Sequence, residues 1–375
     1  MKREVYPPNV WRTRLITLAF ILAVAAPAHQ VSAYYKIIDL GTLGGRSSEA
    51  YSINNNGQIV GWAEDSSKNM KATLFDQTGG GNNIDLGALG GKWSEAYSIN
   101  NNGQVAGRAR DSSGYYRATL FEPTGSGKNI DLGTLGGPDS AAWSINDLGQ
   151  IVGVADGKAT LFDPTGGGNN IDLGTLGGRD SHAYSINNYG QIVGYAYVSS
   201  RYYKATLFDP SGGGNNIDLG TLSGWYSNAY SINNYGQIVG GAQNNSGEVI
   251  ATLFDPTGGK NINLGVLVSG GFSDALSINN KDQIVGWAWD SSGYQRATLF
   301  DSTGAGNNID LNTLIDPGLG WGILEYAHSI NDNGWIVGYG INPAGQYRAY
   351  LLIPEPASAA IMVLGATLIA SKRRR

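Results

Sequence analysis

Residues 38–76 read IDLGTLGGRSSEAYSINNNGQIVGWAEDSSKNMKATLFD, and this stretch decides the fold because the chain repeats it. Each copy begins with Ile-Asp-Leu-Gly or a close variant, and successive copies lie 41 to 47 residues apart. The Asp of this motif stands at Asp39, Asp85, Asp131, Asp172, Asp218 and Asp310, with Asn263 in the sixth copy. A period in the forties is typical of one supersecondary unit packed on its own copies.

One copy predicts four short β-strands. The apolar runs 50–54 and 58–63 flank Asn55-Asn56-Gly57, and Asn and Gly tolerate the positive φ of a tight hairpin turn. A third run follows at 72–76, and a fourth at 83–87 after a Gly-rich loop. Because the hairpin makes the first two strands antiparallel, the pattern argues against a parallel β-solenoid.

The two ends of the array predict how it closes. It begins with an isolated strand of the fourth type, 35–40, and ends with a strand of the third type, 348–353. Pairing these two completes seven units of four strands and removes the open sheet edge. We therefore expect an all-β fold over residues 34–353: a seven-bladed β-propeller of four-stranded blades, the last blade closed by the N-terminal strand.

A glycine stands inside the second strand of every unit. These residues are Gly61, Gly107, Gly153, Gly194, Gly240, Gly286 and Gly338. Glycine ordinarily weakens a strand, so we expect two backbones to approach closely, or a β-bulge, at this position.

The first 33 residues predict a secretory signal peptide. Lys2, Arg3, Arg12 and Arg14 precede the apolar run 15–28, and Val31-Ser32-Ala33 is a small-residue cleavage site for signal peptidase. An uncleaved membrane anchor is the less favoured alternative, because the apolar run is shorter than the roughly 20 residues of a spanning helix.

The last 22 residues, 354–375, form a second signal. Pro354-Glu355-Pro356 precedes the mostly apolar run 357–370, and Lys372 follows with Arg373, Arg374 and Arg375. This order resembles a PEP-CTERM sorting signal. The resemblance implies a Gram-negative host, a transient tether in the inner membrane, cleavage by an exosortase, and delivery to the cell surface or an exopolysaccharide biofilm matrix. An ordinary stop-transfer anchor is the alternative.

The repeat itself resembles the HAF family of extracellular bacterial repeats. Ser181-His182-Ala183-Tyr184-Ser185-Ile186-Asn187 is the copy most like the family pattern, and the resemblance covers nearly all of residues 37–353. Most copies here replace the histidine. The family implies secretion but no general activity.

Composition excludes several classes of protein. The chain has no cysteine, so disulfides, thiolate metal sites and cysteine nucleophiles are impossible. Without the two terminal signals, the remaining chain holds 17 basic and 28 acidic residues, a net charge of −11. This charge argues against nucleic acid as a partner.

The residue before the Ala of the first strand differs between copies and is our first candidate site. The first strand of a propeller blade is innermost, so these residues predict a ring around one mouth of the axial channel. They are Glu49, Glu95, Ala141, His182, Asn228, Asp274 and Tyr326. Such groups suit a polar ligand or a structural cation such as calcium. The alternative is that they are solvated loop ends and that the protein holds no cofactor or metal.

Loops on the same face are rich in aromatic residues and form our second candidate site. The residues chosen are Trp93, Tyr116, Tyr203, Trp225, Tyr226, Phe272, Tyr294 and Trp321. Flat rings beside Asn, Asp and Arg suit stacking against sugar rings. Packing between adjacent loops explains them equally well.

Catalysis has little support in the sequence. Residues 34–353 hold only two histidines, at different repeat positions, and no Gly-x-Ser-x-Gly nucleophile elbow. A glycosidase pair of Glu49 and Glu95 would rest on equal repeat positions alone. We predict no enzyme but an exported surface or matrix module that binds polysaccharide. A polysaccharide-active enzyme and a protein-protein interaction scaffold remain the alternatives.

Overall fold

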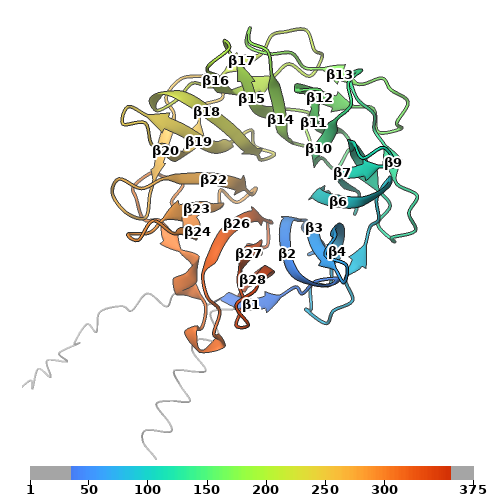
Figure 1. The fold of residues 1–375 in the computed structure, drawn as a ribbon. Coiled ribbons are helices and arrows are strands. Elements are labelled where there is room, and N and C mark those ends of the chain that lie inside the picture. Colours follow the sequence, from blue (N-terminus) through green and yellow to red (C-terminus); the bar gives the residue numbers. More distant parts are fainter. Residues whose placement is uncertain (1–34, 356–375) are drawn as a thin grey trace, which may run out of the picture. The chain divides into compact units, whose positions relative to one another are not determined.

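The computed structural model describes residues 35–355 and shows seven antiparallel sheets arranged in a ring around a central axis (Figure 1). Each sheet has four strands, and in six of the seven sheets the strands follow one another from the centre of the ring to its rim in chain order. The expected all-β, seven-bladed propeller is therefore confirmed. Apart from strands, the described residues form two short 3-10 helices, η1 (Leu311–Leu314) and η2 (Pro317–Leu319).

The first blade contains β2 (Gly44–Ile53), β3 (Ile59–Asp65), β4 (Met70–Phe75) and β5 (Ile84–Asp85). Later blades repeat this order, with these bounds: β6 (Gly90–Ile99), β7 (Val105–Asp111), β8 (Tyr116–Phe121), β9 (Ile130–Asp131); β10 (Ser140–Ile145), β11 (Ile151–Ala155), β12 (Lys158–Phe162), β13 (Ile171–Asp172); β14 (Ser181–Ile186), β15 (Ile192–Tyr197), β16 (Tyr203–Phe208), β17 (Ile217–Asp218); β18 (Ser223–Ile232), β19 (Ile238–Asn244), β20 (Val249–Phe254), β21 (Ile262–Gly265); β22 (Ser273–Ile278), β23 (Ile284–Trp289), β24 (Gln295–Phe300), β25 (Ile309–Asp310).

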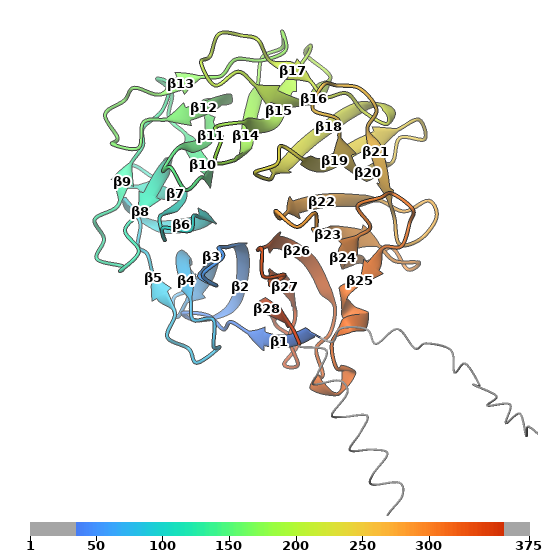
Figure 2. The ribbon, with the colours of Figure 1, turned by 180° about the vertical axis from the view of Figure 1, so that it is seen from behind.

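The seventh blade closes the ring as expected. It consists of β26 (Leu324–Ile330), β27 (Ile336–Ile341), β28 (Tyr347–Pro354) and, outermost, β1 (Tyr35–Asp39). β1 runs antiparallel to β28, with Tyr35 opposite Pro354 (Figures 1 and 2).

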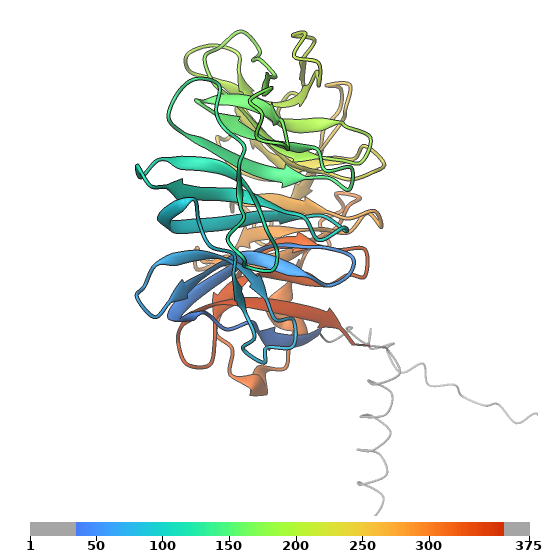
Figure 3. The same cartoon turned by 90° about the vertical axis from the view of Figure 1, so that its right-hand side faces the viewer.

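Two faces of the ring are useful for orientation (Figure 3). We call the face with the hairpin turns between first and second strands the turn face, and the opposite face, with the loops between second and third strands, the loop face. Pro354 lies beside Gly334 of the last hairpin turn. Because Tyr35 pairs with Pro354, both ends of the described chain lie at the turn face.

The outermost strand is shorter than predicted. In the first blade it covers only Ile84 and Asp85, where residues 83–87 were expected. Asn83 replaces the missing ladder bonds with its side chain. Its Oδ1 accepts a hydrogen bond from the Asp76 N–H (2.8 Å), and its Nδ2 donates one to the Leu40 carbonyl at the edge of the seventh blade (2.8 Å). The outer edge of a blade is thus held by side-chain hydrogen bonds to its neighbour.

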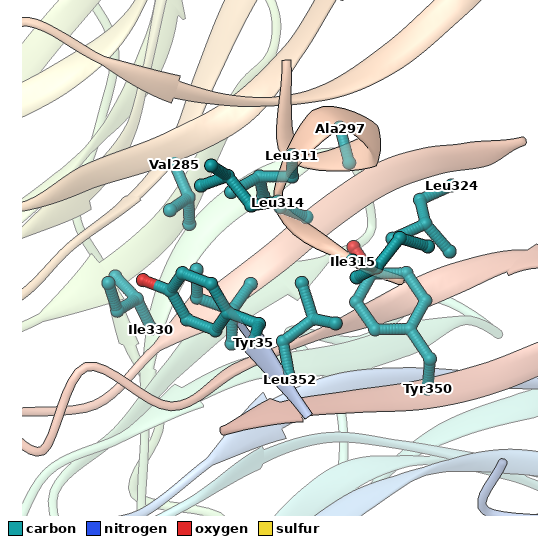
Figure 4. Packing of buried hydrophobic residues seen from close by; sticks show 12 residues of the cluster. Tyr35, Val285, Ala297, Leu311, Leu314, Ile315, Leu324, Ile330, Tyr350 and Leu352 are labelled. Atoms are coloured by element: carbon teal, nitrogen blue, oxygen red, sulfur yellow. The ribbon is translucent and has the colours of Figure 1, made fainter. Parts of the chain in front are cut away.

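The core of the protein lies between the blades. Each of the seven blade interfaces buries one apolar cluster, built from Ala, Val and Leu of one blade and Ala, Ile and Phe of the next. At the seam, Tyr35 of β1 and Tyr350 of β28 pack with Leu314 and Ile315 beside η1 (Figure 4). Burying apolar side chains in this way supplies most of the favourable free energy of folding.

The glycine of the second strand meets a β-bulge, as predicted. In the fourth blade the register shifts between Ala183 and Ser185, and a Cβ added to Gly194 would collide with the His182 carbonyl oxygen. The glycines at the equivalent positions face the same carbonyl in their own blades.

Candidate functional site

Aromatic side chains line the channel wall. They follow the Ala of the first strand in each blade and are Tyr51, Tyr97, Trp143, Tyr184 and Tyr230, with Leu276 and His328 completing the ring. Ring centroids of neighbouring blades lie close together, for example 5.4 Å for Tyr51 and Tyr97 and 4.4 Å for Tyr97 and Trp143. Sequence reasoning assigned this position to the shared blade and missed it. The available signal was that nearly every copy places a ring at this innermost position.

The channel opens on the turn face into a polar cavity of about 180 Å³. One asparagine per blade lines it, and each donates a hydrogen bond from Nδ2 to the backbone carbonyl of its counterpart in the next blade, at 2.8–3.0 Å. These residues are Asn54, Asn100, Asn146, Asn187, Asn233, Asn279 and Asn331. The bond from Asn331 to Asn54 closes the ring. Sequence reasoning took these residues only as hairpin ends.

The residues that follow these asparagines form a second ring at the same mouth, and in two blades this residue is an aspartate. Asp147 Oδ2 accepts hydrogen bonds from Asn101 and Asn188 at 3.0 and 2.8 Å. Asp332 is held in the same way by Asn55 and Asn280. Burial raises the pKa of each aspartate, but the hydrogen bonds outweigh it and the pKa of both is lowered. Because these oxygens already have partners, we assign the turn-face mouth to closure of the ring rather than to a ligand.

The predicted ring of residues before Ala lies toward the loop face, and two of its carboxylates are engaged by neighbours. Glu49 is 2.7 Å from Nε2 of His328 and accepts a hydrogen bond from the Trp62 indole at 3.1 Å. Glu95 forms an ion pair with Arg108 at 2.6 Å. Both carboxylates are thus occupied in the described structure, which gives no support to an acid/base pair.

Two further members of the predicted ring pack against aromatic side chains, and a third faces a glycine. His182 stacks on Tyr195 with centroids 4.9 Å apart, and burial lowers the pKa of its imidazole. Tyr326 stacks on Tyr339 at 5.2 Å. Asn228 pairs in the ladder with Gly241. The residues of the predicted ring therefore have different local environments and do not form one uniform site.

Asp274 is the exception in this ring. Its Oδ1 is buried and has no hydrogen-bond partner among residues 35–355, and it forms none of the ion pairs found there. It lies over Gly241 of the preceding blade, where a Cβ would collide with that oxygen. Burial raises the pKa of Asp274 to about 7.

Stability should therefore depend on pH through Asp274. The folded state holds the Asp274 proton more tightly than the unfolded chain, in which the pKa of this carboxyl is 3.8. The free energy of unfolding therefore falls as the pH rises from about 4 to about 7. Asp274→Asn removes this cost. We expect the variant to be more stable than the parent at pH 8, by about 2 kcal/mol after discounting for partial exposure, and to show no gain at pH 4. Urea unfolding at both pH values measures the difference, and an equal gain at both would contradict the assignment.

The predicted aromatic residues fall into separate clusters. In the second blade, the guanidinium of Arg110 lies 5.2 Å from the Trp93 ring and 4.7 Å from the Tyr116 ring. Arg108 also lies over Tyr116, at 4.3 Å. Tyr116 and Trp93 thus both pack against the same arginine. In this blade the aromatic residues therefore serve packing within the protein, the alternative to sugar binding.

The fourth and fifth blades bring three of the predicted residues together in a continuous series. Tyr203 lies 5.0 Å from Tyr226, Tyr226 lies 5.8 Å from Tyr202, and Tyr202 stacks on Trp225 at 4.9 Å with planes 23° apart. Tyr203 also contacts Tyr195 at 5.1 Å, which in turn lies 5.7 Å from Tyr184 of the channel wall. We call these six residues, Tyr184, Tyr195, Tyr202, Tyr203, Trp225 and Tyr226, the aromatic track. It runs from the channel to Trp225, which is 61% exposed.

The remaining predicted residues serve other contacts. Phe272 packs on Trp289 at 4.5 Å, and Tyr294 borders a cavity of about 330 Å³ with Trp289 and Glu325. Trp321 packs against the seam cluster and lies 6.4 Å from Tyr350. The loop-face aromatics therefore do not form one surface.

The predictions of a structural cation and of the two terminal signals can be compared with the structure only within residues 35–355. Residues 35–355 contain no group of three His, Asp or Glu side chains placed to hold a metal ion. None of the helices in the described part of the chain could span a membrane. Pro354 ends β28, and Glu355 follows it. The signal peptide of residues 1–33 and the rest of the sorting signal, with Pro356, Arg373, Arg374 and Arg375, lie outside the described residues.

The fold and the channel define a β-propeller of seven homologous repeats. No protein-family model matches the chain, and no curated protein matches it. Among solved structures, it is similar to TolB from Acinetobacter baumannii, with 12% identity, 83% of this chain and 64% of that chain covered, and a TM-score of 0.44. It is also similar to a gluconolactonase from Xanthomonas campestris, with 12% identity, coverage of 87% and 92%, and a TM-score of 0.45. The chain thus spans less than two thirds of TolB, and neither likeness bears on its function.

Proposed function

We propose that the protein is an exported binding module that holds polysaccharide on its loop face, along the aromatic track. The observation that carries this proposal is the stacked pair of Tyr202 and Trp225, which continues inward through Tyr226 and Tyr203. A series of rings about 5 to 6 Å apart that begins at the surface suits successive contacts with a chain of sugars.

Polar groups beside the track suit the hydroxyl groups of a sugar. The backbone N–H of Trp225, in β18, donates to the side chain of Gln243, in β19, at 2.9 Å, and this bond ties the two strands together at the exposed indole. Lys204 follows Tyr203, the first residue of β16. A rigid aromatic surface with polar neighbours binds sugars at low cost in conformational entropy, because its side chains are already ordered.

The placement of the two chain ends supports a surface role. Tyr35 and Pro354 both lie at the turn face, so a tether at the predicted sorting tail would leave the loop face free. Export by the signal peptide, processing by exosortase and a final position in the surface matrix are parts of this proposal that rest on the sequence. The protein need not be an enzyme to act there.

Truncating the exposed indole tests the proposal. Trp225→Ala should weaken binding of residues 34–353 to a polysaccharide retained on a glycan array by about tenfold, or about 1.4 kcal/mol. Tyr235→Ala is the matched control, because Tyr235 is 75% exposed but lies in a hairpin turn on the turn face.

Three outcomes would count against the proposal. Retention of no glycan by the parent protein would remove the basis for polysaccharide binding and favour the scaffold alternative. Equal binding by Trp225→Ala and the parent would move the site off the track. Release of shortened oligosaccharides would favour the polysaccharide-active enzyme.

A further inference from the structure

A cavity of about 330 Å³ opens on the loop face between the sixth and seventh blades. The sixth blade contributes Trp289 at the end of β23, Tyr294 before β24, and Gln295, which pairs with Trp289 across the ladder. The seventh blade contributes Ile323 and Glu325. Ligand pockets range from about 300 to 1,000 Å³, so a cavity of this size suits a small ligand rather than a chain.

The seventh repeat is longer than the others at this cavity. Asn279 and Asn331, hydrogen-bonded counterparts at the turn-face mouth, lie 52 residues apart, whereas such neighbours in the preceding blades lie 46 or 41 residues apart. The extra residues precede β26, in the segment that forms η1 and η2 and continues to Ile323 at the edge of the cavity. Insertions in single repeats often belong to a binding face.

Glu325 stands where the other six blades carry a serine. The Oγ of that serine accepts a hydrogen bond from a backbone N–H of the neighbouring blade at 2.9–3.0 Å. In the seventh blade, Leu324 pairs with Gly340 and the next ladder pair begins at Tyr326. Glu325 between them therefore has no ladder partner and forms a β-bulge, a feature that re-aims side chains. Here the bulge places a carboxyl-bearing residue at the cavity.

The Glu325 carboxylate has no counter-charge in the described part of the chain. It forms none of the ion pairs found among residues 35–355, and the residue is partly exposed. Burial raises the pKa of this carboxyl, so hydrogen bonds donated by a ligand would stabilise its ionised form.

Aromatic side chains form one wall of the cavity. The Trp289 ring is held by Phe272, with centroids 4.5 Å apart, and Tyr294 is 60% exposed. A sugar residue packs the apolar face of its ring on such a wall, and its hydroxyl groups hydrogen-bond to a carboxylate or to an amide such as that of Gln295. The charge of Glu325 would repel a second carboxylate, so an acidic sugar is disfavoured.

We propose that the cavity between the sixth and seventh blades binds one neutral hexose residue, and that Glu325 excludes uronic acids from it. This site goes beyond the proposed function, because it shares no residue with the aromatic track. A pocket that holds a single residue takes the end or a side branch of a glycan, whereas the track offers contacts to successive sugars.

Monosaccharides test the pocket without the track. Methyl glycosides of glucose, galactose and mannose are titrated into residues 34–353, with methyl glucuronide as the acidic probe. The NMR signal of the Trp289 indole N–H, assigned by its loss in Trp289→Phe, reports binding at the cavity. The variants are Glu325→Gln and Tyr294→Ala, and the rest of each spectrum shows whether the variant is folded. Tyr115→Ala is the matched control, because Tyr115 has the repeat position of Tyr294 in the second blade and is 46% exposed.

We expect at least one neutral glycoside to shift the Trp289 signal and to bind at least tenfold more tightly than methyl glucuronide. Glu325→Gln should lose this preference, Tyr294→Ala should bind at least fivefold more weakly, and Tyr115→Ala should bind like the parent. No shift with any of the three neutral glycosides would overturn the site. Methyl glucuronide bound as tightly as they are, or a preference kept by Glu325→Gln, would overturn the role of the carboxylate.

Trp225→Ala separates this site from the proposed function. Binding of the glycoside at the cavity should be unchanged in this variant, because Trp225 lies on the track. If the parent binds the glycoside at the cavity but retains no polysaccharide, the pocket stands and the proposed function fails. Loss of glycoside binding in Trp225→Ala would place the sugar on the track and overturn the pocket.

Discussion

Deleting residues 34–41 should lower the midpoint of thermal unfolding by about 10 °C. The deletion removes β1 and with it the buried side chains of Tyr35 and Leu40, which belong to the clusters on either side of the seventh blade. Each contributes about 2 to 3 kcal/mol through burial, so the loss is about 5 kcal/mol, and a domain of this size loses about 2 °C for each kcal/mol. Differential scanning calorimetry against residues 34–353 measures the change.

The same deletion should open an edge. β28 would expose its unpaired N–H and C=O groups, which pair readily with another chain. We therefore expect light scattering to show association that depends on protein concentration, and a synthetic peptide of residues 34–42 to reverse it. An unchanged midpoint in a monomeric variant would contradict the closure of the ring by β1.

Gly194→Ala should cost about 3 kcal/mol or more. The added Cβ would meet the backbone carbonyl of His182, and neither backbone can move without disturbing the bulge at Ala183. Gly306→Ala is the control, because Gly306 has a φ of +86° but open space around it. That variant should lose only about 1 kcal/mol, from the left-handed backbone conformation. Chemical denaturation measures the free energy of unfolding of both variants. Equal losses would contradict the close approach of Gly194 to the His182 carbonyl.

The sequence predicted the fold because its signals are local. The turn residues Asn55-Asn56-Gly57 predict the hairpin, and the number of repeats predicts the number of blades. The isolated strand at 35–39 has only one place to pair. The length of the fourth strand was wrong, since the pattern could not show that Asn83 replaces ladder bonds with its own side chain.

The candidate site was less accessible to sequence reasoning, because it depends on neighbours from other blades. Trp93 and Tyr226 occupy the same repeat position, yet Trp93 lies over Arg110 and Tyr226 packs beside Tyr202 and Tyr203. Asp274 was chosen as a variable position, but its burial follows from Gly241, a residue of the blade before it. Ring-shaped hydrogen bonding of Asn54 and its counterparts emerges only once the chain has closed on itself.

The pairing of β1 with β28 also sets the order in which the protein can be completed. Ser48 and Ala349, which join the first blade to the last, are 301 residues apart. β1, which is synthesised first, therefore cannot pair until β28, which is synthesised last, is available. Contacts of such long range slow folding. While the chain is being synthesised from its N-terminus, β1 would be an unpaired edge until the end of the chain is complete. Late closure makes the open ring the species most exposed to aggregation and to proteolysis.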